Sequence, residues 1–106
     1  MSRLLLLLPL LAACPKADPW VPPDQSDLDA ALTDCSGGQT CVIVELGCCD
    51  HCNGGRAVAV AAGQEEAVLA AHGEECPGNT ACTEMGCAPL TATCADDVCV
   101  PVQGEL

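Results

Sequence analysis

The chain has 106 residues, of which 11 are cysteine, and 15 acidic side chains against three basic ones give a formal net charge of -12. This length allows one small domain. Nucleic acid is excluded as a partner, because phosphate backbones are bound by clusters of Lys and Arg. What remains is whether the cysteines serve as crosslinks, metal ligands or redox groups, and that depends on the compartment.

The N-terminus is typical of an export signal. Arg3 supplies a cationic start, and residues 4–11 form an apolar run that only Pro9 interrupts. This run is too short for a bilayer, which needs about 20 apolar residues, but it suits the central region of a signal peptide. We therefore predict that residues 1–13 direct export and are cleaved from the mature chain.

The end of this segment, Leu11-Ala12-Ala13-Cys14, resembles the lipobox of bacterial lipoproteins. The resemblance implies cleavage before Cys14, diacylation of the Cys14 sulfur and often a third acyl chain on the freed amine. The lipid would then anchor the chain to a membrane of the cell envelope. An Asp after the lipidated cysteine would resemble the inner-membrane retention signal of enteric bacteria. Pro15 stands there instead, which favours the outer membrane.

Residues 14–26 are predicted to form a tether between the lipid and the domain. Four prolines stand among residues 15–25, a composition typical of extended polyproline II linkers. Trp20, the single aromatic residue, lies in this tether, where it can rest at the lipid headgroups, lean on the domain or be exposed. Residues 27–106 are predicted to form the cysteine-rich domain.

Cysteine parity supports the same division. Eleven is an odd number, and withdrawing Cys14 for lipid leaves ten residues that can pair completely. Leu, Val, Ile and Phe make up only 16 of the 93 residues from Cys14 onward, too few for a large core. We therefore expect about five disulfides to replace that core. They would be formed among Cys35, Cys41, Cys48, Cys49, Cys52, Cys76, Cys82, Cys87, Cys94 and Cys99.

The first predicted elements are a helix and a strand. Ser26 or Asp27 can cap a helix through about Asp34, because apolar residues follow a helical spacing there. Thr40–Leu46 is rich in β-branched residues and is predicted to be a strand, and Ala57–Val60 a second, shorter one. Since a cysteine- and glycine-rich connection joins them, they are expected to form a hairpin.

The second half is predicted to contain a further helix and a further hairpin. Gln64–His72 is predicted to be a helix that Gly73 ends, with acidic residues in its first turn and His72 in its last. Residues 91–94 and 98–102 flank Asp96-Asp97 as a final hairpin. The predicted fold class is a small disulfide-rich α+β domain of short antiparallel hairpins and two short helices.

The densest chemistry lies in Cys48-Cys49-Asp50-His51-Cys52, directly followed by Asn53-Gly54-Gly55-Arg56. The simplest interpretation places the three cysteines in three disulfides with different partners and leaves a polar loop between them. Arg56 is the sole cation of the predicted domain, and a carboxylate or phosphate ligand can dock beside it, although a salt bridge to an acidic residue is the default. The candidate ligand loop is therefore Asp50, His51, Asn53, Gly54, Gly55 and Arg56.

Three alternatives stay open. Cys49, His51 and Cys52, with Cys48 nearby, offer ligands that Zn or Cu(I) accepts. Cys49-Asp50-His51-Cys52 resembles the active-site pair of periplasmic thioredoxin-like oxidants, but the glycines that follow disfavour the helix that such a site needs. Residues 87–94 can form an extended protease-inhibitor-like loop that presents Leu90.

Enzyme motifs are absent from the sequence: there is no G-x-S-x-G, H-E-x-x-H or phosphate-loop pattern. We therefore expect a binding or structural module without cofactor, whose partners are a membrane, through the lipid, and a protein or small ligand. The chain resembles small cysteine-rich bacterial lipoproteins, a resemblance that implies location rather than chemistry.

Overall fold

A computed structural model describes residues 23–104. The predicted signal peptide, the lipidated Cys14 and most of the tether, Trp20 included, lie outside the described residues. Within 23–104, neither helix is long and apolar enough to cross a bilayer.

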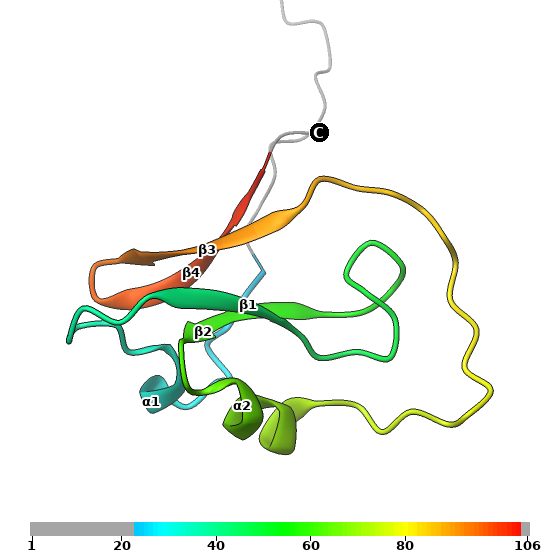
Figure 1. Cartoon of the computed structure of the whole chain (residues 1–106), viewed down its shortest axis with the longest axis horizontal. Coiled ribbons are helices and arrows are strands. Elements are labelled where there is room, and N and C mark those ends of the chain that lie inside the picture. The colour runs from blue at the N-terminus through cyan, green and yellow to red at the C-terminus, as the bar shows by residue number, and fades with distance from the viewer. Residues whose placement is uncertain (1–22, 105–106) are drawn as a thin grey trace, which may run out of the picture.

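The described chain confirms the predicted small disulfide-rich α+β fold. Two antiparallel hairpins, β1–β2 and β3–β4, form separate two-stranded sheets, and two short helices lie on the far side of β1–β2 from β3–β4 (Figure 1). The elements in chain order are α1 (Ala30–Thr33), β1 (Cys41–Glu45), β2 (Ala57–Ala61), α2 (Glu65–His72), β3 (Leu90–Ala95) and β4 (Val98–Gln103).

The two faces of the β1–β2 hairpin carry different side chains. One face meets the helices in a cluster of bulkier residues: Leu28, Leu32, Val44, Leu46, Val58, Val60 and Val68. The other face presents the small Ala59 and Ala61, which with Cys35 and Cys99 form a second buried cluster toward β3–β4. Because side chains alternate along a strand, the pattern Ala-Val-Ala-Val-Ala of β2 supplies both faces, and its alanines allow the second hairpin to approach closely.

The first helix is shorter than predicted. The prediction began it at Ser26 or Asp27, whereas α1 begins after Asp29, whose carboxylate accepts a hydrogen bond from Ala31 N at 3.0 Å. The residues before it form a turn instead, with Leu28 N bonded to Gln25 O at 3.0 Å. The physical reason is the competition of short polar side chains for backbone donors, shown by Ser26 N, which is bonded to the Asp24 carboxylate at 2.9 Å.

The other elements follow their predictions closely. Helix α2 starts one residue after the predicted Gln64 and ends at Gly73, whose N–H donates to Leu69 O at 2.9 Å. The final hairpin turns at Asp96 and Asp97, which have φ of 52° and 66°. Two consecutive left-handed residues are typical of the type I′ turns that match strand twist, and Asp tolerates that conformation.

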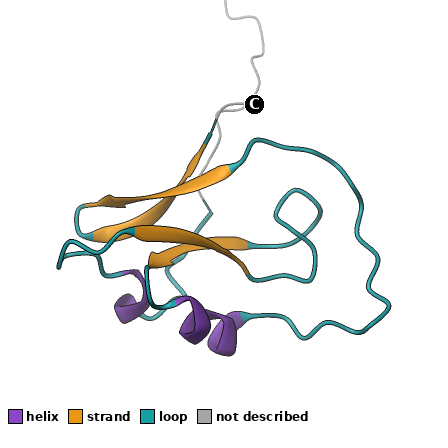
Figure 2. Cartoon of the chain, viewed as in Figure 1, coloured by secondary structure: helices purple, strands orange, loops and turns teal. Residues whose placement is uncertain are grey.

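All ten cysteines of the described residues are paired. Cys35–Cys94 and Cys41–Cys99 tie the first half of the domain to the second hairpin. The other three bonds join the β1–β2 connection to residues 74–89, a long loop without helix or strand (Figure 2). This cystine ladder consists of Cys48–Cys76, Cys49–Cys82 and Cys52–Cys87, in the same order along both segments.

One side chain covers the free edge of β2. Gln25 accepts from Ala59 N at 2.6 Å and donates to Ala59 O at 3.1 Å, as a neighbouring strand would. Its amide nitrogen also reaches Cys99 O, at 3.3 Å, on β4. Gln25 therefore bridges the two hairpins and protects an edge that could otherwise pair with another chain.

We expect Gln25→Ala to lower the free energy of unfolding by about 2 to 4 kcal/mol, because it leaves backbone groups of β2 without their partner. Chemical denaturation followed by circular dichroism measures the loss. The exposed Gln39 gives the matched control, and Gln39→Ala should leave the midpoint unchanged. A Gln25 variant as stable as the Gln39 variant would contradict the bridging role.

Candidate functional site

The β1–β2 connection is a compact loop held by Asp50. The Asp50 carboxylate accepts from Cys52 N at 3.1 Å and from Asn53 Nδ2 at 2.7 Å, and its backbone oxygen accepts from Asn53 N and Gly55 N, both at 2.9 Å. Asp50 thus shapes the loop through its Oδ1 and its backbone oxygen. Its local hydrogen bonds are those expected of Asp in a turn.

The two glycines of the candidate loop have different reasons to be glycine. A Cβ at Gly55 would overlap the Cys49 carbonyl oxygen and lie 2.8 Å from its carbon, so the loop can close only without a side chain. Gly54 has a φ of +95° with open space around it. Close approach of the chain to itself therefore explains Gly55, whereas a left-handed backbone explains Gly54.

Asn53 joins the β1–β2 connection to the long loop of residues 74–89. Its Oδ1 accepts from Thr83 Oγ1 at 2.6 Å and from Met85 N at 2.7 Å, and its Nδ2 donates to Met85 O at 3.2 Å. Together with its bond to Asp50, these contacts use both ends of the amide. Asn53 is a structural bridge across the cystine ladder.

Arg56 forms the salt bridge that the sequence predicts as its default. Its guanidinium donates to both Asp27 oxygens, at 3.0 and 2.7 Å, and to Asp24 O at 3.2 Å. The hydrogen bonds that Arg56 donates to Asp27 lower the pKa of the Asp27 carboxyl group and raise the pKa of the Arg56 guanidinium. Arg56 thereby fastens residues 24–27 to the loop. Because its charge is already paired with Asp27, Arg56 is a weaker candidate for binding an anion.

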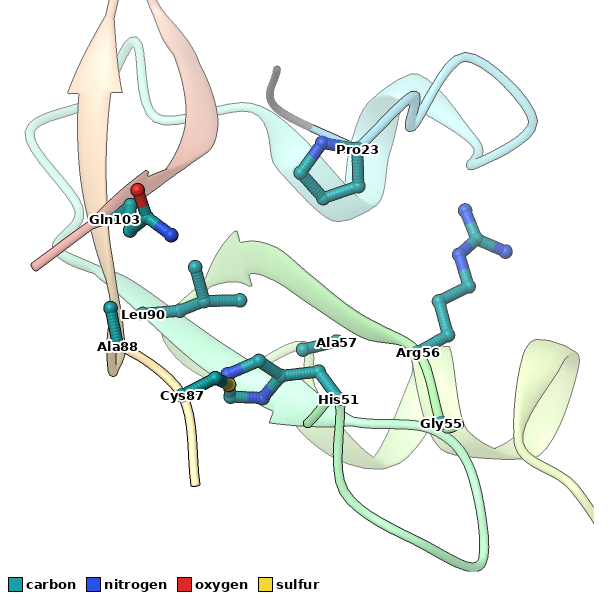
Figure 3. Close-up of a pocket in the computed structure, with 9 residues that line it drawn as sticks. All are labelled: Pro23, His51, Gly55, Arg56, Ala57, Cys87, Ala88, Leu90 and Gln103. Carbon is teal, nitrogen blue, oxygen red and sulfur yellow. The ribbon is translucent and has the colours of Figure 1, made fainter. Parts of the chain in front are cut away.

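His51 borders a cavity of about 410 Å³ between the loop and the second hairpin (Figure 3). Its Nδ1 lies 2.6 Å from Glu45 Oε2, and its backbone N donates to Glu45 Oε1 at 3.0 Å. Nε2 is buried and makes no hydrogen bond among the described residues. Other side chains that line the cavity are Arg56, Ala57, Cys87, Leu90 and Gln103.

The hydrogen bond to Glu45 is the main cause of the raised pKa of His51, and partial burial opposes it. The Ala88 backbone raises this pKa by a smaller amount, although His51 Nε2 makes no hydrogen bond within the usual distance and angle limits. A raised pKa means that the ion pair stabilises the fold fully below about pH 6.5, the unfolded value. This stabilisation is lost as the pH rises through the folded value.

We therefore expect Glu45→Gln to lower the His51 pKa and to flatten the decline of stability above pH 6.5. Titration of the histidine ring protons by NMR measures the first effect, and thermal unfolding between pH 5 and 8 the second. Glu66→Gln, on the exposed face of α2, is the matched control for losing one negative charge. If both variants shift the His51 titration equally, the Glu45 contact is not its cause.

The structure corrects the metal and exchange hypotheses at one position. Cys49 is bonded to Cys82 and not to Cys52, so the C-x-x-C spacing does not form a disulfide. A ring nitrogen of His51 and the sulfurs of Cys52 and Cys87 all lie within 4.8 Å of one another. Among residues 23–104, the cysteine that lies beside His51 and Cys52 is therefore Cys87 and not Cys49.

The predicted inhibitor-like loop is not a free loop. Leu90–Ala95 is strand β3, Leu90 is paired with Gln103, and its side chain is half-buried at the cavity. A protease that binds an extended loop needs its backbone groups unpaired, and β4 already pairs with one edge of β3. Among residues 23–104, a longer stretch that is both exposed and irregular is residues 74–87.

Sequence reasoning found His51 and Cys52 but missed their neighbours. The sequence predicts Glu45 only as part of a strand, and Cys87 as a disulfide cysteine at the start of the inhibitor-like loop, not as a neighbour of His51. The one available signal was the alternation of β1, which places Glu45 on an exposed position directly before the loop. Cys87 lies 35 residues from Cys52, and no local pattern connects them.

No protein-family model matches the chain, and no curated protein and no solved structure is significantly similar to it. The functional argument therefore depends on the geometry of the domain itself.

Proposed function

We propose that this chain is an exported, lipid-anchored binding module of the bacterial cell envelope, held in shape by disulfides and without enzymatic activity or cofactor. One observation carries the proposal: the ten cysteines of residues 23–104 form five disulfides. The eleventh, Cys14, is the one that the lipobox resemblance assigns to lipid. Such a density of disulfides is typical of small exported domains.

The thin core supports export to an oxidising compartment. Val58, Val60, Val68 and Cys99 are the largest fully buried side chains of the described domain. Each contributes little burial free energy compared with the aromatic residues of ordinary cores. A chain of this composition depends on crosslinks that persist outside the cytoplasm.

The cavity beside His51 is the best-supported binding surface. It combines apolar walls at Ala57 and Leu90 with the ring of His51 and the amide of Gln103, a mixture typical of small-ligand sites. Since Arg56 is occupied by Asp27, the ligand we propose is an uncharged polar molecule or peptide group that accepts a hydrogen bond from the protonated His51 ring. The negative charge of the domain disfavours anions.

Intact mass spectrometry of protein extracted from membranes tests export, acylation and crosslinking together. We expect a chain that begins at Cys14, carries the mass of two or three acyl chains, and gains ten hydrogen atoms on reduction. Cys14→Ser should abolish the lipid mass and move the protein to the soluble fraction. A full-length, unacylated chain in the cytosol with free thiols would refute the proposal.

Binding at the cavity is tested by NMR with a set of fragment-sized amides and alcohols. We expect some of them to shift the His51 ring resonances, and Leu90→Arg to abolish these shifts by filling the cavity. Val102→Arg places the same charge on an exposed position of the same hairpin and should leave them intact. Shifts that survive in the Leu90 variant would assign binding elsewhere.

A further inference from the structure

Two groups of possible metal ligands occur among residues 23–104. Cys35, Cys41 and Cys99 lie in the core, where Cys99 is fully buried and Cys35 is 3% exposed. His51, Cys52 and Cys87 lie at the cavity, with His51 and Cys52 half-buried and Cys87 exposed. The second group is the more accessible of the two to a reductant and a metal ion.

His51 is already oriented as a metal ligand. Histidines that bind metals usually donate their second ring N–H to a carboxylate, which fixes the tautomer and the direction of the ring. The Nδ1 of His51 makes this contact with Glu45 at 2.6 Å, and a second bond from the His51 backbone holds the same carboxylate. The nitrogen left over, Nε2, is buried and without a hydrogen-bond partner.

The third bond of the cystine ladder can open while the site stays assembled. Cys48–Cys76 and Cys49–Cys82 still join the two segments, and Asn53 still binds Thr83 and Met85. Two thiolates on one tetrahedral Zn(II), with Zn–S bonds of about 2.3 Å, stand about 3.8 Å apart. The two sulfurs must therefore move apart by about 2 Å. Because Cys87 lies outside any strand, this movement needs no rearrangement of the sheets.

We propose that a dithiol reductant converts the Cys52–Cys87 bond into part of a Cys2His site for a thiophilic cation, Zn(II) or Cu(I). The dithiol supplies two electrons and two protons and becomes a disulfide itself. The metal then displaces the two thiol protons and binds both sulfurs and the His51 nitrogen, while Glu45 holds the ring. Thiolate and imidazole are the ligands these ions prefer. The inference goes beyond the proposed function and needs neither the lipid nor the cavity ligand.

The first experiment identifies the bond and counts the metal. Full-length protein is titrated with a dithiol, and alkylation with mass spectrometry shows which cysteines have opened. We expect Cys52 and Cys87 to open while the two core bonds remain closed. The partly reduced protein should then bind one Zn(II) per molecule, and one Co(II) with the thiolate charge-transfer absorption. Cu(I) competition shows which ion is preferred.

Matched variants test the ligand set. C48A/C76A/C49A/C82A keeps only the Cys52–Cys87 bond of the ladder, and C48A/C76A/C52A/C87A keeps only Cys49–Cys82. After reduction each has two ladder thiols, and we expect only the first to bind zinc tightly. If the first variant fails to fold, zinc binding is measured instead on wild-type protein in which only the Cys52–Cys87 bond has been reduced. This measurement also shows whether Cys52 and Cys87 are the zinc ligands.

His51→Gln should weaken Zn(II) binding at least a hundredfold, and Glu45→Gln by about 10- to 100-fold, as for other carboxylates behind ligating histidines. His72→Gln removes the other histidine of the chain and should change nothing. Equal affinity in the His51 and His72 variants, or no binding by protein whose Cys52 and Cys87 are reduced, would overturn the proposal. Neither result would bear on export or acylation.

Discussion

Reduction of all five disulfides should unfold the domain in the absence of denaturant. In the chain-entropy account, bonds that close loops of 28 to 59 residues contribute about 4 kcal/mol each. Because the five loops overlap, these contributions are not additive, but their total is still comparable to the roughly 5 to 15 kcal/mol by which a typical domain is stable. The core cannot compensate, because the largest side chains it buries completely are three valines and Cys99.

Circular dichroism and hydrogen exchange with and without reductant measure this effect. We expect the strand signal to disappear and amide protection to collapse throughout residues 23–104. Variants that lack a single bond refine the prediction. C41A/C99A should lower the free energy of unfolding more than C48A/C76A, because Cys99 is fully buried whereas Cys76 is exposed. A fully reduced protein that keeps its protection would show that the small core suffices.

Gly55→Ala should be the most damaging single substitution outside the cysteines. The added Cβ would overlap the Cys49 carbonyl and lie 2.9 Å from Asp50 O, and both are backbone atoms that no rotamer change can move. We expect a loss of about 3 kcal/mol or more. The oxidised protein should also form mispaired ladder bonds, since the loop that aligns three cysteines can no longer close.

Two glycines provide controls for this prediction. Gly54→Ala meets no atom within 4 Å but is strained by its φ of +95°, so it should cost about 1 to 2 kcal/mol. Gly78 has open space and no such backbone, and Gly78→Ala should be neutral. Urea denaturation and disulfide mapping of the three variants rank them. Equal stability of the Gly54 and Gly55 variants would contradict the steric argument.

The strands and turns were predictable because the signals that determine them are local. Val42, Ile43 and Val44 are β-branched and favour a pleated strand, and Asp96-Asp97 accepts the left-handed backbone of a tight hairpin turn. Helix α2 has its acidic first turn and its terminal glycine within nine residues. None of these choices required knowledge of distant contacts.

The remainder of the fold depended on distant contacts. The start of α1 was decided by Asp29 and by Asp24 bonding nearby backbone, against an apolar spacing that also fitted a longer helix. Cysteine spacing could not reveal the pairing, because each bond joins residues at least 28 apart. Leu90 seemed available in an extended segment only because its partner Gln103 was not known.

Most residues of the candidate ligand loop have structural tasks. Asp50 and Asn53 hold backbone, Gly55 permits a close approach, and Arg56 pairs with Asp27. Residue type alone does not separate these tasks from ligand binding, because the same polar atoms serve both. His51 differs through its buried Nε2, which only the assembled fold can place.

Residues 74–87 are exposed along their whole length, and apart from the sulfur bonds few of their side chains contact the body of the domain. Substitutions and short insertions between the cysteines of this stretch should therefore be tolerated, for instance at the turn where Thr80 N bonds Pro77 O. The sequence of this stretch is therefore free to vary while the fold beneath it stays constant. It is also the natural place to insert an epitope tag.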